Sequence, residues 1–320
     1  MKKSPKILVV GSFVMDLICS ASRFPQSGET IMGTSFSTAP GGKGANQAVQ
    51  AARLGAKVSM VGKLGRDDFG RQILRSLEDS QVDTSNVLFS DTCATAVGNI
   101  QLEVTENGTA NRIMVIPGAN MDITPEEIRF LKEAICKYDM VILQLEIPME
   151  INIAVAKLAF ENGVPVMLNS APSAPIPDEL YKCLTYISPN EHEASDMTGI
   201  AVKDISSAKA ATEVLLSKGV KNALITMGKQ GAVFANKTGF WSSPCVDFGV
   251  TVDPTAAGDS FVGAFCTAIC LGDTVEQALL FANHTAGITV SRMGAQPSLP
   301  TIEDVVAFMK QNKHDISNYI

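Results

Sequence analysis

The chain has 320 residues, of which 46% are hydrophobic and 18% are charged, and its formal net charge is −7 at pH 7. This composition is ample for a sizeable core in one large domain or two small ones. The acidic balance argues against nucleic acid or an anionic membrane as the main partner, although a helix terminus on an acidic protein can still bind phosphate.

The chain shows no sign of a membrane span or of a metal cluster. No stretch reaches 18 consecutive apolar residues, and the start "MKKSPKILVVGSF" has too short an apolar core for a signal peptide. Seven cysteines without a CxxC pair predict reduced thiols in the cytoplasm. The three histidines do not cluster in the sequence, so a zinc site is not expected.

Apolar strand patterns alternate with helical patterns along most of the chain. Short apolar runs predict strands, whereas apolar residues spaced i, i+3, i+4, i+7 predict helices. In chain order we expect a strand at 6–10, a helix from about 45, a strand at 57–62, a helix at 67–80, a strand at 139–144, a helix at 148–162, strands at 164–169 and 184–188, a helix at 204–218 and a strand at 222–227. The last 60 residues look almost wholly helical. The order predicts an α/β fold, a mostly parallel sheet with helices on both faces.

Two regions depart from this alternation. Residues 98–104 alternate polar and apolar side chains, and an Asn-Gly pair at 107–108 separates them from "RIMVI", which predicts a hairpin. "FVMDLICS" and "IMGTSFST" flank a segment with turn-forming Pro and Gly. We expect a single domain over 1–320, with strands inserted at about 13–38 and 97–117 forming a small antiparallel sheet that serves as a lid, a dimer surface or both.

The glycine-rich stretch "APGGKGANQA" (39–48) leads directly into the first expected helix. It is not a P-loop, because Ser37 and Gly44 stand where glycine and Ser or Thr are needed, and no GxGxxG follows the first strand. The glycines would let backbone N–H groups approach a ligand, although a tight turn is the plainer reading. Asn46 and Gln47 favour a ligand site, because polar side chains at a buried helix opening need partners.

Two acids follow or interrupt apolar strands. Asp16 lies among apolar neighbours, and Glu146 ends the run "VILQLE". An unpaired carboxylate in such a place is costly, and the carboxyl end of a parallel strand is where open α/β sheets bind ligands. Each acid is therefore either a ligand contact or an ordinary surface or paired group.

The stretch "SPNEHEA" (188–194) predicts a helix start. Ser188 and Glu191 have the spacing of a capping box, which accounts for Glu191 but leaves Asn190 and Glu193 without a role. An amide and a carboxylate at a strand-to-helix junction suit contact with magnesium-bound phosphate, often through water. The later "TMGKQG" (226–231) is by itself only a turn.

The stretch "DPTAAGDSF" (253–261) opens a helix with small residues and one acid. The plain interpretation is that Thr255 or Asp253 caps the helix and Asp259 complements its dipole. The small residues would also expose the first N–H groups of the helix, which could hold the charge of a phosphoryl group in transfer. Asp259 could then accept the proton of an attacking hydroxyl, as phosphoryl transfer requires.

Together these stretches resemble the phosphofructokinase-B family of carbohydrate kinases, and its ribokinase branch most of all. The resemblance runs nearly end to end in the order "GSFVMD", "GGKGANQA", "LQLE", "NEHE", "TMGKQG", "DPTAAGDSF" and "GAQPS". It implies ATP-dependent transfer of phosphate to the 5-hydroxyl of D-ribose by a cytoplasmic homodimer joined through the lid. The alternatives are 2-deoxyribose or another small sugar or nucleoside as acceptor, or a catalytically silent sugar-binding protein. The missing GxGxxG disfavours a nicotinamide-dependent oxidoreductase.

The resemblance also implies a role for each matching residue. It makes Asp259 the base, with an anion hole formed by Ala256, Ala257 and Gly258. It assigns sugar binding, with Asp259, to Val14, Met15, Asp16, Gly42, Lys43, Gly44, Ala45, Asn46 and Glu146. It assigns ATP, with Gly258 and Asp259, to Asn190, Thr226, Met227, Gly228, Lys229, Gln230, Gly231 and Asn283. Magnesium would be bound through water by Glu193, and an activating potassium ion by Asp253, Thr255, Thr289, Arg292, Gly294 and Ser298.

One position departs from the resemblance. Val14 stands where some ribokinases carry a polar residue that touches sugar hydroxyls. A valine cannot hydrogen-bond, and a site without a polar partner discriminates less against a missing hydroxyl. The departure keeps 2-deoxyribose open as the acceptor.

Overall fold

The computed structural model describes residues 4–106, 108–246 and 248–319. Its main body is a nine-stranded sheet in the order β13-β12-β11-β10-β9-β8-β1-β4-β5, parallel from β5 to β11 and antiparallel at β12 and β13. The strands are β1 (Lys6–Val10), β4 (Lys57–Gly65), β5 (Val87–Ser90), β8 (Met140–Gln144), β9 (Val166–Asn169), β10 (Tyr186–Ile187), β11 (Asn222–Thr226), β12 (Ala232–Asn236) and β13 (Gly239–Ser243). The mostly parallel sheet confirms the expected α/β class.

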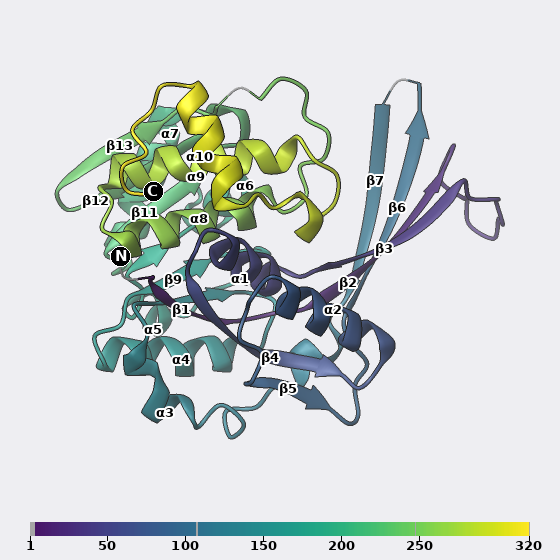
Figure 1. The fold of residues 1–320 in the computed structure, drawn as a ribbon, viewed down its shortest axis with the longest axis horizontal. Coiled ribbons are helices and arrows are strands. Elements are labelled where there is room, and N and C mark those ends of the chain that lie inside the picture. The colour runs from purple at the N-terminus through teal and green to yellow at the C-terminus, as the bar shows by residue number, and fades with distance from the viewer. Residues whose placement is uncertain (1–3, 107, 247, 320) are drawn as a thin grey trace.

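Helices cover both faces of this sheet (Figure 1). One face carries α1 (Lys43–Arg53), α2 (Asp68–Asp79), α8 (Ala257–Leu271), α9 (Val275–Val290) and α10 (Ile302–Gln311). The other carries α3 (Leu131–Ala134), α4 (Met149–Glu161), α5 (Asp178–Tyr181), α6 (Glu191–Thr198) and α7 (Ile205–Ser217). Short 3-10 turns complete the chain at Gly118–Asp122, Ile135–Lys137, Gly228–Gln230 and Gln296–Ser298.

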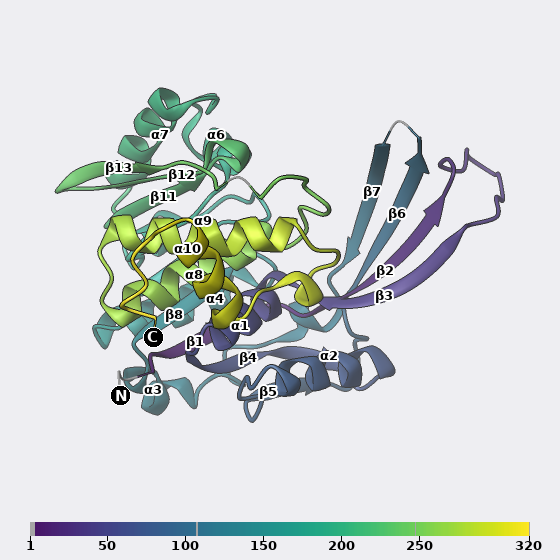
Figure 2. The ribbon, with the colours of Figure 1, turned by 45° about the horizontal axis from the view of Figure 1, so that its top comes forward.

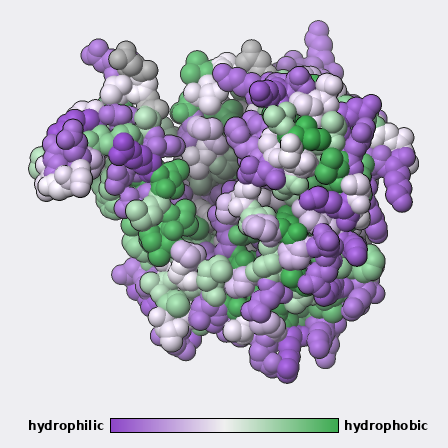
Figure 3. Space-filling view, turned by 180° about the vertical axis from the view of Figure 1, so that it is seen from behind, coloured by the Kyte–Doolittle hydropathy of each residue, from purple (hydrophilic) through white to green (hydrophobic). Residues whose placement is uncertain are grey.

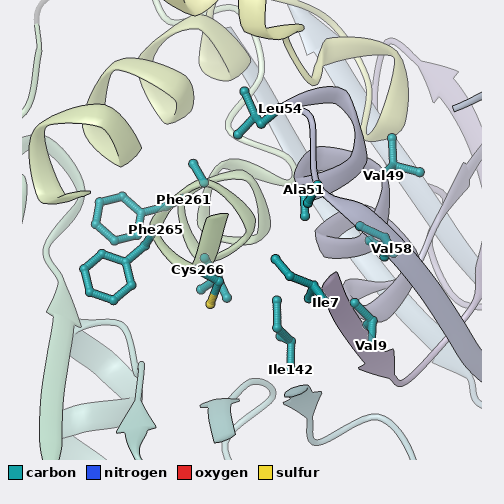
Figure 4. Packing of buried hydrophobic residues seen from close by; sticks show 14 of the residues in the cluster. Ile7, Val9, Val49, Ala51, Leu54, Val58, Ile142, Phe261, Phe265 and Cys266 are labelled. Atoms are coloured by element: carbon teal, nitrogen blue, oxygen red, sulfur yellow. The ribbon is translucent and has the colours of Figure 1, made fainter. Parts of the chain in front are cut away.

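Two apolar cores follow from the alternation of side chains along the central strands. Ile7 and Val9 of β1 pack on the α1 and α8 side, whereas Leu8 and Val10 pack on the α4 side. Successive residues of a strand point to opposite faces, so a strand covered on both faces is apolar throughout. Helix α8 is itself buried along most of its length, and Figure 4 shows its Cys266 beside residues of the central strands.

A second, four-stranded sheet stands off the body (Figures 1 and 2). It consists of β2 (Val14–Ala21), β3 (Ser35–Gly41), β6 (Val97–Thr105) and β7 (Gly108–Ile116) in the order β3-β2-β6-β7. The two expected antiparallel pairs form, but the expectation of a wholly antiparallel sheet is wrong, because β2 and β6 pair in parallel. The Asn107 half of the expected turn lies outside the described residues.

Most expected elements are present, with a few residues gained or lost at their ends. Strands β5, β12 and β13 were not expected; β5 and β13 are the two edges of the large sheet, and β12 lies next to β13. Strands β5 and β13 are only partly buried, so their apolar signal is weaker. Strand β12 is buried over Ala232–Ala235, and its four-residue apolar run was overlooked. No helix in the described part of the chain has both the length and the apolar composition needed to cross a membrane.

Candidate active site

A cavity of about 220 Å³ lies where the parallel strands end. Asn169 closes β9, Ser188 follows β10 and Thr226 closes β11, so the cavity sits at the carboxyl ends of three neighbouring strands. This is the edge at which open α/β sheets bind ligands. The structure brings eight of the predicted residues to its walls: Lys43, Asn190, Glu193, Thr226, Ala256, Ala257, Gly258 and Asp259.

Helix α8 starts at this cavity without a side-chain cap. Its N-cap residue, Ala256, has the left-handed backbone φ of 62° and no capping hydrogen bond. The expectation that Thr255 or Asp253 caps the helix is therefore wrong. The Asp253 carboxylate instead accepts hydrogen bonds from the N–H groups of Thr255 and Gly294, both at 2.9 Å. It thereby fixes the loop that leads into the helix.

The first turn of α8 leaves donors and space at the cavity. The N–H groups of Gly258 and Asp259 are second and third in the helix, where no helical carbonyl can reach them. A Cβ added to Gly258 would meet nothing within 4 Å. The N–H of Ala257, by contrast, donates to Pro254 O at 3.2 Å. An anionic group can therefore approach the helix start closely at Gly258.

The carboxylate of Asp259 is buried and doubly hydrogen-bonded. Its residue is 7% exposed. Oδ1 accepts from Gln47 Nε2 at 3.0 Å, and Oδ2 accepts from Asn46 Nδ2 at 2.9 Å. Asn46 and Gln47 thus find partners within the protein, so their polarity alone does not require a ligand. Asn46 Oδ1 is buried and accepts no hydrogen bond from the described residues, so it remains available to a hydroxyl of a bound molecule.

The glycine-rich stretch lets α1 start against the loop between β1 and β2. Gly42 has a φ of 94°, and a Cβ there would lie 2.7 Å from Val14 N. A Cβ on Gly44 would lie 2.5 Å from Ser12 N. Both contacts are closer than any side chain permits, so this approach requires glycine. The glycines therefore serve a tight turn packed against the protein's own loop, and their approach to a ligand stays a prediction.

Glu146 holds the start of α1 through one carboxylate oxygen. Its Oε2 accepts from Ser12 Oγ at 2.5 Å and from Lys43 N at 3.1 Å. An acid that binds two donors of the protein itself is at least a paired group. The structure thus supplies the pairing that the sequence left open and places this carboxylate beside the Lys43 backbone.

Asp16 occupies a slot between two glycines of the small sheet. A Cβ on Gly98 would lie 2.4 Å from Asp16 Oδ1, and one on Gly41 would lie 3.0 Å from Oδ2. Burial, and then the nearby charges of Glu146 and Asp253, raise the pKa of Asp16 to about 6. No described residue donates a hydrogen bond to this carboxylate. The protein thus keeps a costly acceptor that its own side chains do not satisfy.

Lys43 carries a positive charge that opposes the negative charge of the acids around the cavity. Burial works to lower the pKa of Lys43, but Asp259, Glu146 and Glu193 together raise it above its ordinary value. Burial raises the pKa of Glu193, and the Asn190 N–H and Lys43 only partly oppose this. Lys43 therefore stays a cation, positioned to attract an anion into an otherwise acidic site.

Helix α6 begins at the opposite wall with a capping box. Asn190 Oδ1 accepts from the N–H groups of His192 and Glu193, both at 2.9 Å, and Glu193 Oε2 accepts from Asn190 N at 2.9 Å. The prediction of a Ser188–Glu191 box is wrong. Asn190, and not Ser188, caps the helix because Asn190 forms a β-bridge with Thr226 at the end of β11 and so keeps an extended backbone. The cap gives Asn190 and Glu193 a structural role at the cavity wall.

The residues expected to line a nucleotide pocket divide into two groups. Asn190, Thr226, Gly258 and Asp259 line the cavity already described, and the others lie outside it. Lys229 lines a second cavity of about 290 Å³, formed mainly by the segment that precedes Asp253. Asn283 donates to Ser243 and Pro244, and Gln230 donates to Lys203 O, so both amides bind the protein itself. Met227 is buried, and Gly228 and Gly231 have positive φ in the turn that follows β11.

The six residues expected at a potassium ion lie around the loop before α8. Asp253 is hydrogen-bonded to Thr255 and Gly294, as described above. The remaining three are tied to the protein: Thr289 Oγ1 to Ser260 Oγ at 2.7 Å, Arg292 to Asp304 at 3.0 Å and Ser298 Oγ to Ala295 O at 2.7 Å. The described residues contain no group of three or more His, Cys, Asp or Glu placed to bind a metal. A cation here would need main-chain oxygens.

Sequence reasoning missed several polar residues beneath the cavity. Gln144 and Asn169 are buried at the ends of β8 and β9, and Ser12 is buried two residues after β1. A polar residue that closes an apolar strand is a usable signal, because its neighbours predict burial and burial demands a partner. The sequence analysis applied that signal to Glu146 alone.

Comparison with known proteins places the chain among carbohydrate kinases. It belongs to the pfkB family of carbohydrate kinases, whose family model matches residues 4–302. It is 42% identical to the ribokinase of Bacillus subtilis over 300 residues, which cover 93% of this chain and 97% of that protein. It is 34% identical to the deoxyribokinase of Salmonella typhimurium over 308 residues, covering 96% and 99%.

A solved structure gives the same result for the fold. The structure of Arabidopsis thaliana ribokinase complexed with ribose and ATP superposes with a TM-score of 0.91 at 34% sequence identity. The match covers 96% of this chain and 99% of that one. The nine-stranded sheet with its separate small sheet is thus the architecture of a ribokinase structure, as the sequence analysis expected.

Proposed function

We propose that the protein is an ATP-dependent ribokinase that phosphorylates D-ribose at its 5-hydroxyl. The observation that carries the proposal is the placement of the Asp259 carboxylate beside the open first turn of α8, in one cavity with Lys43. A base, an anion-binding helix start and a cation are the parts that phosphoryl transfer requires of a protein. The similarity to ribokinases supports ribose as the acceptor.

In the proposed reaction the sugar hydroxyl oxygen forms a bond to the γ-phosphorus of ATP, and the bond from that phosphorus to the ADP oxygen breaks. The hydroxyl proton passes to Asp259. The N–H groups of Gly258 and Asp259 face the negative charge of the transferring group, and the N–H of Ala257 can join them by leaving Pro254 O. The positions of these donors fix the direction of attack.

The sugar would bind between the small sheet and α1. Asp16 offers two acceptor oxygens that no described residue uses, and Asn46 Oδ1 offers a third. Glu146 and the Gly42–Lys43 backbone complete the site, and Val14, Met15, Gly44 and Ala45 shape it. ATP would extend from Asn190 and Thr226 past the 226–231 turn toward the cavity beside Lys229. Asn283 would support this pocket by holding the Ser243–Pro244 segment.

Two cations fit this chain's residues. Glu193 reaches the cavity next to the helix start, where it can bind the water shell of a magnesium ion held mainly by phosphate. Magnesium would neutralise the charge of the phosphates when bound. Potassium would be held mostly by main-chain oxygens, those of the loop that Asp253 fixes to Thr255 and Gly294 and those of Thr289, Arg292 and Ser298.

A coupled assay of ATP consumption tests the proposal. Ribose, 2-deoxyribose, fructose and adenosine are compared at equal concentration in potassium buffer with magnesium. We expect the highest kcat/KM with ribose. If adding ribose does not increase ATP consumption, the proposal is contradicted, even if one of the other three acceptors is phosphorylated.

Deoxyribokinase activity is a second candidate, favoured by Val14. Its side chain is buried beside the Asp16 slot and lies 3.6 Å from the position of a Cβ on Gly98. A methyl group there cannot hydrogen-bond a hydroxyl, so the loss of one hydroxyl costs little. Replacing Val14 by Ser should raise the preference for ribose over 2-deoxyribose several-fold, and an unchanged ratio would remove Val14 as the discriminating residue.

We also propose a single kinase domain that dimerises through the small sheet in the cytoplasm. Ile113 and Val115 of β7 are 58% and 51% exposed on the face of the small sheet that carries Asp16. In Figure 3 apolar residues gather near the junction of this sheet with the body. An apolar sheet face of this kind is typical of a surface that a second copy covers. Light scattering should give the mass of a dimer, and Ile113→Lys should reduce it to that of a monomer.

A further inference from the structure

A chain of buried amides runs beneath Asp259. Gln144 Nε2 donates to Gln47 Oε1 at 2.7 Å, and Gln47 Nε2 donates to Asp259 Oδ1 at 3.0 Å and to Asn169 Oδ1 at 3.1 Å. Asn169 Nδ2 in turn donates to Ser188 O at 2.8 Å. Gln47 and Gln144 are fully buried. The base is therefore connected to the ends of three strands through side-chain amides.

The two acceptors at the Asp259 end of this chain fix which way the Gln47 amide faces, and Gln47 in turn orients Gln144. Its oxygen is occupied by the Gln144 N–H, and its nitrogen faces two acceptors, Asp259 and Asn169. Asn169 cannot turn to offer its own nitrogen, because that nitrogen is held by the Ser188 carbonyl. A reversed Gln47 would set its oxygen against the Asp259 carboxylate and against Asn169 Oδ1, leaving buried acceptors unsatisfied.

The backbone next to Gln144 leaves space for its side-chain amide. A Cβ on Gly11 would lie 1.8 Å from Gln144 Oε1 and 3.0 Å from its Cδ. Strand β1 therefore has to be followed by glycine for the amide to fit. Within the described part of the chain nothing donates to Gln144 Oε1, so a buried oxygen is left unpaired while the nitrogen is directed at Gln47. A buried polar atom without a hydrogen-bond partner is rare in native structures and calls for an explanation.

We propose that Gln47, held by Gln144, is a positioning residue that fixes the rotation of the Asp259 carboxylate for proton transfer. With Asn46 on Oδ2 and Gln47 on Oδ1, both carboxylate oxygens are held in place, and their remaining lone pairs face the cavity. The reacting hydroxyl then meets an acceptor that is already oriented. This inference rests on the proposed role of Asp259 as the base.

Gln47→Glu is the sharpest test, because it preserves size and the bond from Gln144 but places a second carboxylate against Asp259. Two carboxylates at this separation share a proton, so the base is blocked at neutral pH and is released as the pH rises. Lys43 and Glu193 are the other charged groups that face Asp259, and both are unchanged in the variant. We expect kcat with ribose to fall about 100-fold at pH 7 and the loss to shrink markedly by pH 9, with the KM for ATP unchanged.

Two further variants separate positioning from packing. Gln144→Met removes the donor to Gln47 without touching Asp259, and a fall in kcat of about 5- to 10-fold is expected. Gln50→Glu is the matched control: Gln50 is also a buried amide of α1, but it is hydrogen-bonded to Pro300 O and Ser260 and not to Asp259. It should lower the melting temperature while kcat stays within two-fold.

The outcomes distinguish this inference from the proposed function. A folded Gln47→Glu protein with kcat within two-fold of wild type at pH 7, or with the same loss at pH 7 and pH 9, overturns the positioning role. If that variant does not fold, a Gln144→Met kcat within two-fold of wild type overturns it. Loss of turnover in Asp259→Asn alongside normal Gln47 variants would leave the kinase proposal standing and remove only the positioning role.

Discussion

Replacing Asp16 by Asn should stabilise the protein without ligand while weakening its binding of sugar. The pKa of Asp16 is raised from 3.8 to about 6 by burial and by the charges of Glu146 and Asp253. Since each pKa unit is worth about 1.4 kcal/mol, the ionised carboxylate costs the folded state about 3 kcal/mol above pH 6. Asparagine nearly matches the shape of the side chain and removes that charge.

The pH dependence of this gain has a definite sign. Because the pKa is higher in the folded state, the folded protein holds the proton more tightly than the unfolded chain between pH 3.8 and about 6. The stability contributed by Asp16 therefore falls as the pH rises through this window. Asp16→Asn should raise the free energy of unfolding by about 3 kcal/mol at pH 8, and this gain should decline toward zero near pH 4.

Urea denaturation at pH 8 and pH 4, without sugar, measures the gain. Asp79→Asn is the matched control, because Asp79 is an exposed carboxyl on α2 outside the cavity. In the same protein the KM for ribose should rise about 10- to 100-fold, since a charged acceptor is worth about 1.5–3 kcal/mol to a hydrogen bond. An Asp16→Asn protein no more stable than wild type at pH 8, or equally stabilised at pH 4, would refute the reasoning.

The other predictions concern the first turn of α8 and the loop before it. Gly258→Ala should leave the melting temperature unchanged or slightly raised, because its Cβ meets nothing within 4 Å, but should lower kcat at least about 10-fold by occupying the phosphate space. An unchanged kcat would contradict the proposal that the first turn of α8 binds the transferring phosphate. Turnover should be faster in potassium chloride than in sodium chloride at equal ionic strength, and equal rates would remove the cation site.

The central strands could be predicted because they are buried on both faces. Strands β1, β8 and β9 are continuous apolar runs bounded by polar residues, and that pattern depends on little beyond the strand itself. The parallel pairing of β2 with β6 could not be predicted from the sequence. More than 75 residues separate the paired residues, and parallel and antiparallel pairing both keep the same alternation of side chains. The edge strand β13 was missed because it lacks a continuous apolar run, whereas the short apolar run of β12, Ala232–Ala235, was overlooked.

The residues of the candidate site could be proposed from the sequence, whereas the contacts that support them could not. Asp259, Gly258 and Lys43 stand in local stretches whose residue types suit phosphate and a base, so each could be found alone. The partners of Asp259 lie more than 200 residues away along the chain, and only the fold brings them together. The cap of α6 shows the same limit: Ser188 and Asn190 both suit a cap, and the bridge from Asn190 to Thr226 decides between them.

The most direct test of the account is the turnover of Asp259→Asn with ribose and ATP. The change removes a proton acceptor while keeping nearly the same volume, so kcat should fall by about 10²–10⁴-fold, while the Kd for ATP measured by calorimetry stays within two-fold. An Asp259→Asn enzyme that phosphorylates ribose at close to the wild-type rate would show that the proton goes elsewhere, and the proposed mechanism would be wrong.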